Sequence, residues 1–189
     1  LSTQKTKGRF FFFFKLKTVD AETLLSTPMR KTMFIVDNLI PQGVNVISGA
    51  SKIGKSWLML WLGMQVARGN PVWEFETHKC DVLYLCLEDT HVRIQNRLYQ
   101  LTDEAPAELR IATTSYQIGN GLEQQIEDYL SDFPNTKLVI IDTFQKVRDS
   151  RNAIGKSGMY AGDYDDITAL KTISDRFGIA VVVVHHVRK

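Results

Sequence analysis

The amino-acid sequence predicts an α/β fold in which a mainly parallel central sheet is flanked by helices on both faces. Nearly continuous apolar runs at residues 81–87, 137–141 and 179–184 have the length and composition of strands buried on both faces of a parallel sheet. Segments with helical patterns separate these runs, as expected for alternating strands and helices. A glycine-rich loop between the first strand and the following helix indicates the same fold class.

Length and composition are typical of one soluble globular domain. The chain has 189 residues, of which 44% are hydrophobic and 23% are charged. Its net charge of +2 gives no argument for a nucleic-acid partner, so such binding would require a local basic patch. Cys80 and Cys86 lack metal-ligand spacing and are interpreted as buried free thiols. Because no apolar run approaches the ~18 residues that span a bilayer, and no secretion signal is present, we expect a cytoplasmic protein without a membrane partner.

Residues 1–38 are interpreted as a lead-in segment or tail before a core at 39–189. Five phenylalanines at positions 10–14 are flanked by basic residues, a pattern that fits an edge strand, a tail or a membrane-surface contact. Polar and apolar residues alternate from 18 to 38, with a break at a threonine–proline pair. We assign no function to this segment.

Residues 49–56 fit the phosphate-loop pattern of a glycine, any four residues, and then glycine, lysine and serine or threonine. The loop lies between a predicted strand at 44–48 and a predicted helix at 57–68, which is the context it requires. Glycines let the backbone curve around a phosphate, and the helix N-terminus adds a positive dipole end. Lys55 would neutralise the outer phosphates of a nucleoside triphosphate, and Ser56 would ligate Mg²⁺. The predicted nucleotide-binding residues of this stretch are Gly49, Ala50, Ser51, Lys52, Ile53, Gly54, Lys55, Ser56 and Trp57.

An acidic pair, Glu88 and Asp89, follows the apolar run at 81–87. Open α/β sheets bind ligands at the carboxyl ends of their strands, so Glu88 is a candidate to orient the water that attacks a terminal phosphate. The alternative is that both carboxylates only begin the next helix, where they suit the helix dipole.

A helix is predicted at 90–101. Val92, Gln95, Leu98 and Tyr99 are predicted to lie on one face of this helix. Arg93 and Arg97 are four residues apart on this helix, and they form either a solvated basic face or a contact to the nucleobase.

A second aspartate motif follows a short strand at 109–112 and an amphipathic helix at 122–130. The apolar run at 138–141 ends in Asp142, the pattern called Walker B. Such a pattern is common in parallel sheets, but its position downstream of a phosphate loop supports a nucleotide role. Asp142 would hold Mg²⁺ through water or through Ser56.

Glycines and basic residues mix between positions 145 and 162. Two interpretations remain open: a solvated connector, or a loop that binds a phosphodiester backbone. The candidate DNA-binding residues are Arg148, Arg151 and Lys156. A helix is predicted at 164–177, with Asp163 as its N-cap.

His185 and His186 follow the last apolar run at the sheet edge that carries Glu88 and Asp142. Neighbouring side chains of a strand point to opposite faces, so only one histidine is expected to face the nucleotide, where it would sense the terminal phosphate. The alternative is a core histidine beside an exposed one.

Four motifs together resemble the RecA-type ATPase core: GASKIGKS at 49–56, LYLCLED at 83–89, LVIID at 138–142 and VVVVHH at 181–186. Within that group the chain is similar to the RepA-like hexameric replicative helicases of plasmids and phages, relatives of DnaB. The resemblance covers residues 39–189.

The resemblance implies a ring, expected to be a hexamer, with ATP and Mg²⁺ between subunits and single-stranded DNA in the central channel. It implies that Glu88 is the catalytic base, that Asp142 serves Mg²⁺, that the pair His185 and His186 senses phosphate, and that Arg97 lies near the nucleotide. Because the family continues into further strands that supply an arginine finger, we expect this core to be C-terminally incomplete.

We therefore expect a RecA-like P-loop ATPase, and we favour a replicative DNA helicase of a plasmid, phage or mobile element. One alternative is a RecA- or KaiC-like ATPase that acts as a nucleotide-dependent assembly module. Another is a small-molecule kinase, although a glutamate at the end of the second strand favours water as the phosphoryl acceptor. The predicted catalytic residues are Lys55, Glu88, His185 and His186.

Overall fold

A computed structural model describes residues 16–29, 32–148 and 159–187. Contacts divide the chain into two compact units, residues 1–31 and 32–189. In the first unit, helix α1 (Ala21–Ser26) begins after Asp20, whose carboxylate accepts a hydrogen bond from the N–H of Thr23 at 2.8 Å. This is an ordinary N-cap, which supplies a partner for one of the free amides of the first turn.

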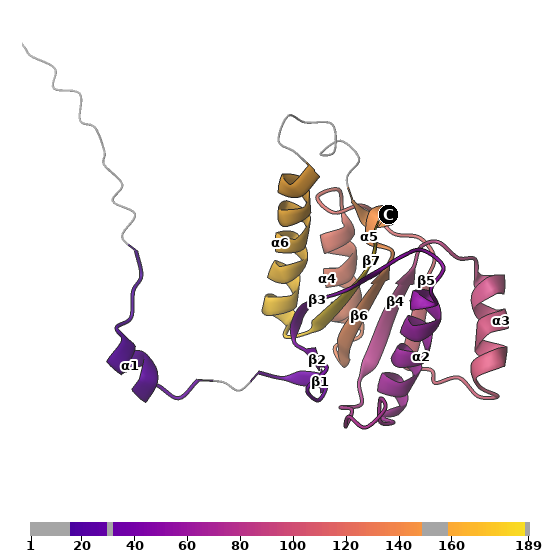
Figure 1. Cartoon of the computed structure of the whole chain (residues 1–189), viewed down its shortest axis with the longest axis horizontal. Helices are drawn as coiled ribbons and strands as arrows, with labels where there is room; N and C mark the ends of the chain where they lie inside the picture. The colour runs from indigo at the N-terminus through magenta and orange to yellow at the C-terminus, as the bar shows by residue number, and fades with distance from the viewer. Residues whose placement is uncertain (1–15, 30–31, 149–158, 188–189) are drawn as a thin grey trace, which may run out of the picture. The chain divides into compact units, whose positions relative to one another are not determined.

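The second unit is built on a five-stranded sheet whose described strand pairs are all parallel. The strands are β3 (Gly43–Gly49), β4 (Asp81–Cys86), β5 (Leu109–Ala112), β6 (Thr136–Asp142) and β7 (Ala180–His186). Their order across the sheet is β3-β7-β6-β4-β5 (Figure 1). The predicted parallel α/β sheet is thereby confirmed, and each predicted strand differs from the observed one by at most two residues at either end.

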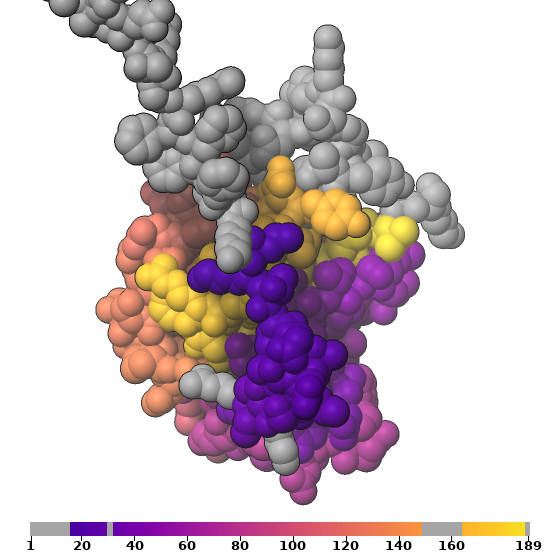
Figure 2. All heavy atoms as spheres, turned by 90° about the vertical axis from the view of Figure 1, so that its left-hand side faces the viewer, coloured from indigo at the N-terminus to yellow at the C-terminus, as the bar shows by residue number. Residues whose placement is uncertain are grey.

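Helices cover both faces of this sheet. On one face lie α2 (Lys55–Arg68) and α3 (His91–Leu101), and on the other lie α4 (Leu122–Asp132) and α6 (Met159–Phe177) (Figure 1). In Figure 2 the side chains of α6, in yellow, lie beside those of α4, in orange-pink. A short helix, α5 (Phe144–Val147), follows the carboxyl end of β6.

Strand alternation explains why the apolar runs are continuous. Val82 and Tyr84 of β4 point into the core on the α2 side, whereas Leu83 and Leu85 point into the core on the α4 and α6 side. Both sets are at most 5% exposed. Since successive side chains alternate between the two faces, a strand covered on both faces needs an apolar residue at every position.

A two-stranded antiparallel sheet precedes β3, formed by β1 (Phe34–Val36) and β2 (Ile40–Pro41). The alternating pattern of residues 18–38 predicted only a lead-in segment and not this hairpin. Asn38 in its turn has a φ of 58°, a left-handed conformation that asparagine tolerates better than most residues.

Two helix predictions are wrong in detail. On α3 the buried residue is Ile94, which the prediction did not single out, whereas Val92 and Tyr99 of the predicted apolar face are 66% and 71% exposed. The helix turns its Ile94 and Leu98 stripe to the sheet, because these residues share one face at a spacing of four. Helix α6 begins at Met159, so Asp163 lies inside the helix and is not its N-cap.

Among the described residues, no helix is long and apolar enough to cross a membrane.

Candidate active site

The parallel register brings the ends of four strands to one edge of the sheet. Gly49 at the end of β3 is level with His186 of β7. Asp142 of β6 is level with Val184 of β7 and with Cys86 of β4, two residues before Glu88. The phosphate-loop, aspartate, glutamate and histidine motifs are therefore neighbours in space, although they are far apart in the sequence.

The backbone requires glycine at position 54 of the loop that joins β3 to α2, and at position 49 a side chain would displace the end of Ile53. Gly54, the N-cap of α2, has a φ of 92°, a conformation that residues with a Cβ rarely adopt. At Gly49 a Cβ would lie 2.7 Å from Cδ1 of Ile53. Because Gly54 offers no side-chain cap, the first N–H groups of α2 remain available to an anion.

Lys55 is held inside this loop. Its side chain is largely buried, with the residue 7% exposed, and Nζ donates to the carbonyl oxygens of Gly49 at 2.8 Å and Ala50 at 2.7 Å. The ammonium charge thus lies within the curve of backbone that forms the predicted phosphate cradle. A buried cation in that position favours an anionic ligand.

Asp142 is the residue best suited to a metal ion. It is 2% exposed, and its Oδ2 accepts a hydrogen bond from the hydroxyl of Tyr84 at 2.9 Å. Its Oδ1 is buried and has no hydrogen-bond partner in the described part of the chain. A buried carboxylate oxygen is costly unless something compensates it, and Mg²⁺ prefers such oxygen ligands, so the donor set fits this ion.

Tyr84 joins the two predicted Mg²⁺ residues. Its hydroxyl lies 3.4 Å from the backbone oxygen of Ser56 as well as 2.9 Å from Asp142. Burial raises the pKa of the Tyr84 phenol well above its usual value, so the hydroxyl remains a donor at neutral pH. A tyrosine in a buried strand usually needs a hydrogen-bond partner for its hydroxyl. The position of Tyr84 in an apolar run was therefore the one signal in the sequence that it contacts a polar group such as Asp142.

Glu88 is held by Thr143, which directly follows β6, and by His186 of β7. Its Oε1 accepts a hydrogen bond from Oγ1 of Thr143 at 3.1 Å, and its Oε2 lies 3.5 Å from Nε2 of His186. The N–H of Leu87 donates to the carbonyl oxygen of Asp142 at 2.6 Å, which fixes the backbone beside it. Thr143 was not among the residues predicted from the sequence.

The two histidines have different surroundings. His186 lines the cavity beside the phosphate loop. His185 instead packs edge-on against the ring of Phe144, with centroids 6.1 Å apart, and its Nδ1 lies 3.1 Å from Nε2 of Gln145. The structure therefore places His186, and not His185, at the predicted nucleotide site.

The cavity beside the phosphate loop has a volume of about 230 Å³. It is lined by Lys52, Gly54, Lys55, Ser56, Trp57, Arg97 and His186. The remaining predicted loop residues do not line it, and Ile53 is 63% exposed. Two lysines and an arginine around one small cavity favour a polyanionic ligand.

Arg97 reaches the cavity because Asp89 holds it. The guanidinium forms an ion pair with the carboxylate of Asp89 and lies 5.4 Å from the ring centroid of Trp57. Arg93, also on α3, is largely exposed and lies 3.6 Å from Asp89. Of the two arginines, only Arg97 is placed to contact a bound nucleotide.

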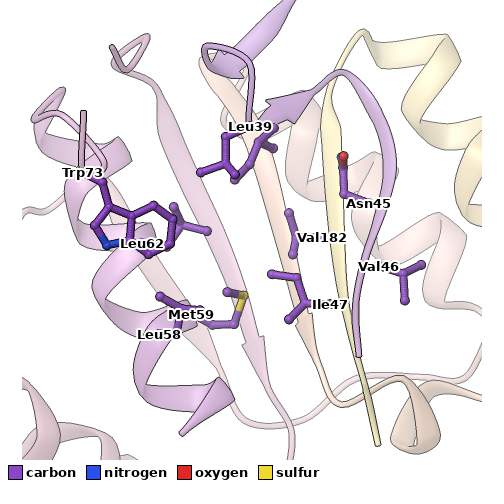
Figure 3. Close-up of a pocket in the computed structure, with 10 residues that line it drawn as sticks. Leu39, Asn45, Val46, Ile47, Leu58, Met59, Leu62, Trp73 and Val182 are labelled. Atoms are coloured by element: carbon purple, nitrogen blue, oxygen red, sulfur yellow. The ribbon is translucent and has the colours of Figure 1, made fainter. Parts of the chain in front are cut away.

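A second cavity of about 230 Å³, between β3 and α2, has a different character (Figure 3). Leu58, Met59 and Leu62 of α2 face Ile47 and Val182 of the sheet across it. It has no charged lining residue, so it does not fit a triphosphate.

Of the predicted DNA-binding residues, only Arg148 is described. Its Nε lies 3.2 Å from Oδ2 of Asp166, and the guanidinium lies 5.6 Å from the ring centroid of Phe144. This side chain ties α5 to α6. Arg151 and Lys156 lie outside the described residues, as does the phenylalanine run at 10–14.

A family model described as an AAA domain matches residues 13–189. The matched range includes the phosphate loop at 49–56, Glu88, Asp142 and the histidine pair at 185–186.

Proposed function

Because the chain belongs to this AAA-domain family of P-loop ATPases, which includes RecA-like and RepA-like ATPases, we propose that it hydrolyses ATP with Glu88 as the base and uses the energy to move on single-stranded DNA. The observation that carries the hydrolytic step is the place of Glu88. Its carboxylate lies beside His186, and His186 lines the same cavity as Lys55 and Ser56. A carboxylate in that position suits the polarisation of a water molecule next to a terminal phosphate.

The other residues of the site divide the work of binding. Lys55 and the free amides of the first turn of α2 stabilise negative charge on the phosphates. Ser56 and Asp142 would hold Mg²⁺, which supplies charge neutralisation when bound. Trp57 and Arg97 present a flat, cationic surface to the nucleobase.

Glu88 accepts the hydrogen bond of the attacking water and takes up its proton as the bond to phosphorus forms. The γ-phosphoryl group leaves ADP, and the products are ADP and inorganic phosphate. Glu88 lies beside His186 and is not among the residues that line the described cavity, so loss of Glu88 should stop hydrolysis without removing the groups that bind ATP.

Coupling to DNA rests on the path from the site to the basic stretch at 145–162. Thr143, which contacts Glu88, is followed directly by α5, and α5 carries the exposed Lys146. The N–H of Ile118 donates to the carbonyl oxygen of Val147 at 2.7 Å, which anchors the end of α5. A DNA strand bound by this stretch would thus contact a segment that continues into the catalytic edge. We favour a replicative helicase of a plasmid, phage or mobile element that assembles into a hexameric ring.

The ion pair between Arg148 and Asp166 supports a second candidate. With Arg148 used to join α5 to α6, fewer basic side chains are left for DNA. A RecA- or KaiC-like ATPase that controls assembly, without unwinding, is the function that this observation favours.

ATP hydrolysis with and without single-stranded DNA at two salt concentrations separates the two functions, with Glu88→Gln as the blank. A DNA motor should be stimulated by DNA, and the stimulation should fade at high salt because phosphate contacts release counterions. Lys146→Ala should weaken the response to DNA, whereas the exposed Lys171→Ala on α6 should not. Hydrolysis that ignores DNA but changes with self-assembly would contradict the motor and support the assembly module.

A further inference from the structure

We propose that Thr143 is a positioning residue for hydrolysis: its hydroxyl holds Oε1 of Glu88 and thereby directs Oε2 to the attacking water. This inference rests on the proposed role of Glu88 as base. It goes beyond that role by naming the group that orients the carboxylate and the oxygen that does the chemistry.

The hydroxyl of Thr143 does not serve its local helix. Thr143 is the N-cap residue of α5, a position where threonine normally accepts a hydrogen bond from an amide of the first turn. Here the side chain makes no such bond, and the N–H of Lys146 donates instead to the carbonyl oxygen of Thr143 at 3.0 Å. The hydroxyl is thus available to Glu88.

Thr143 is a rigid donor, whereas Glu88 is a flexible acceptor. Thr143 has no exposed surface, and its neighbours Asp142 and Phe144 are 2% and 4% exposed. Branching at Cβ restricts its side chain further. The Glu88 side chain is 46% exposed and has three rotatable bonds, so a fixed partner is needed to select one orientation.

The proton of the hydroxyl also decides which carboxylate oxygen reacts. A threonine hydroxyl has one proton, and at 3.1 Å it donates that proton to Oε1. Oε2 is directed instead towards Nε2 of His186, at the wall of the cavity that Lys55 and Ser56 line. Oε2 is therefore the oxygen that faces the place of the terminal phosphate.

Three substitutions isolate the hydroxyl. Thr143→Val replaces it with a methyl group at nearly the same volume, and the pair Thr143→Ser and Thr143→Ala differs by the hydroxyl alone. Thr136→Val is the matched control, because Thr136 is equally buried at the opposite end of β6. For each variant, kcat, KM, the Kd for ATP and the melting temperature are measured.

We expect Thr143→Val and Thr143→Ala to lower kcat about tenfold or more, since misplacement of a reacting group by about 1 Å can cost that much. The Kd for ATP should stay near the wild-type value, because Thr143 does not line the cavity. Thr143→Ser should retain most of kcat, and Thr136→Val should retain all of it. In a Glu88→Gln background, Thr143→Val should cause no further loss, because both changes remove the same unit.

The outcomes separate this inference from the proposed function. If Glu88→Gln abolishes turnover while Thr143→Val and Thr143→Ala keep the wild-type kcat, the positioning role is wrong and the base assignment stands. The positioning role is also wrong if Thr143→Val lowers kcat by the same factor with and without Glu88. If Glu88→Gln itself keeps full turnover, both are overturned. A variant that fails to fold is recognised by its melting curve, and the Ser and Ala pair then decides.

Discussion

Removal of the Tyr84 hydroxyl should destabilise the protein, because among the described residues Tyr84 is the side chain that donates a hydrogen bond to Asp142. In Tyr84→Phe the ring still fills its place, so little packing is lost. The carboxylate of Asp142 is 2% exposed, and its Oδ1 has no hydrogen-bond partner among the described residues. In the variant its Oδ2 also loses its hydrogen bond. A buried carboxylate without its hydrogen-bond donor lowers the free energy of unfolding.

The size of the effect follows from the charge of the acceptor. A hydrogen bond to a charged group contributes about 1.5–3 kcal/mol to the free energy of unfolding. For a chain of this length, each 1 kcal/mol corresponds to about 2–4 °C in melting temperature, so Tyr84→Phe should melt about 3–12 °C below the wild type. Tyr99→Phe is the control, because Tyr99 is 71% exposed on α3.

The assay is thermal unfolding followed by circular dichroism, with and without Mg²⁺ and a non-hydrolysable ATP analogue. Because a bound metal ion gives Asp142 a new partner and stabilises only the folded state, the ligand should narrow the gap between Tyr84→Phe and the wild type. A Tyr84→Phe protein that melts at the wild-type temperature would refute the reasoning. A difference in melting temperature between the two proteins that Mg²⁺ and the ATP analogue leave unchanged would refute it too.

The remaining predictions concern the phosphate loop and the thiols. Lys55→Ala should weaken ATP binding at least about tenfold, which is the usual order for loss of a charged contact. An equilibrium assay with a fluorescent nucleotide measures this change, and unchanged binding would remove Lys55 from the site. Burial raises the pKa of Cys80 and of Cys86 to about 11, so both thiols should react slowly with Ellman's reagent at neutral pH until the protein unfolds. Because the thiols of the unfolded chain have an ordinary pKa of about 9.0, their contribution to stability should be complete below that pH and should be lost as pH rises towards 11. Urea unfolding at several pH values would measure this loss. Cys86 is buried and Cys80 only partly so, and a free energy of unfolding that stays constant between pH 8 and 11 would contradict the raised pKa of these thiols.

The sheet could be predicted because each buried strand is recognisable from its own residues. The runs at 138–141 and 181–184 are apolar at every position, and only a strand covered on both faces requires that. The phosphate loop could be predicted for a similar reason, since the positive φ of Gly54 dictates a glycine inside the pattern itself. In the strands and in the loop alike, the residues that determine the structure lie within a few positions of one another in the sequence.

The partners of the site residues could not be predicted, because they depend on the register of distant strands. Thr143 contacts Glu88 across 55 positions of sequence, and Tyr84 contacts Asp142 across 58. No property of a threonine after an aspartate reveals that its hydroxyl reaches a glutamate two residues beyond the end of a neighbouring strand. Arg148 shows the same limit: in sequence it belongs to a basic stretch, and only the packing of α6 reveals its ion pair with Asp166.

Helix α3 shows how a pattern can mislead. Val92 and Tyr99 are apolar or aromatic at a helical spacing, yet they face outward. The stripe through Ile94 and Leu98 fits the sheet instead, and the same orientation lets Arg97 reach Asp89 and Trp57. Two stripes of comparable apolar character could not be ranked without the position of the sheet.

The central claim, that Glu88 is the base of an ATPase, is tested most directly by phosphate release and ATP binding measured on the same preparations of wild type, Glu88→Gln and Glu74→Gln. Glu74 is exposed and lies away from the cavity, so its variant controls for the loss of a carboxylate. We predict that Glu88→Gln binds ATP like the wild type but releases phosphate at least about 100-fold more slowly, the usual contribution of a general base. Phosphate release at the wild-type rate by Glu88→Gln would contradict the account.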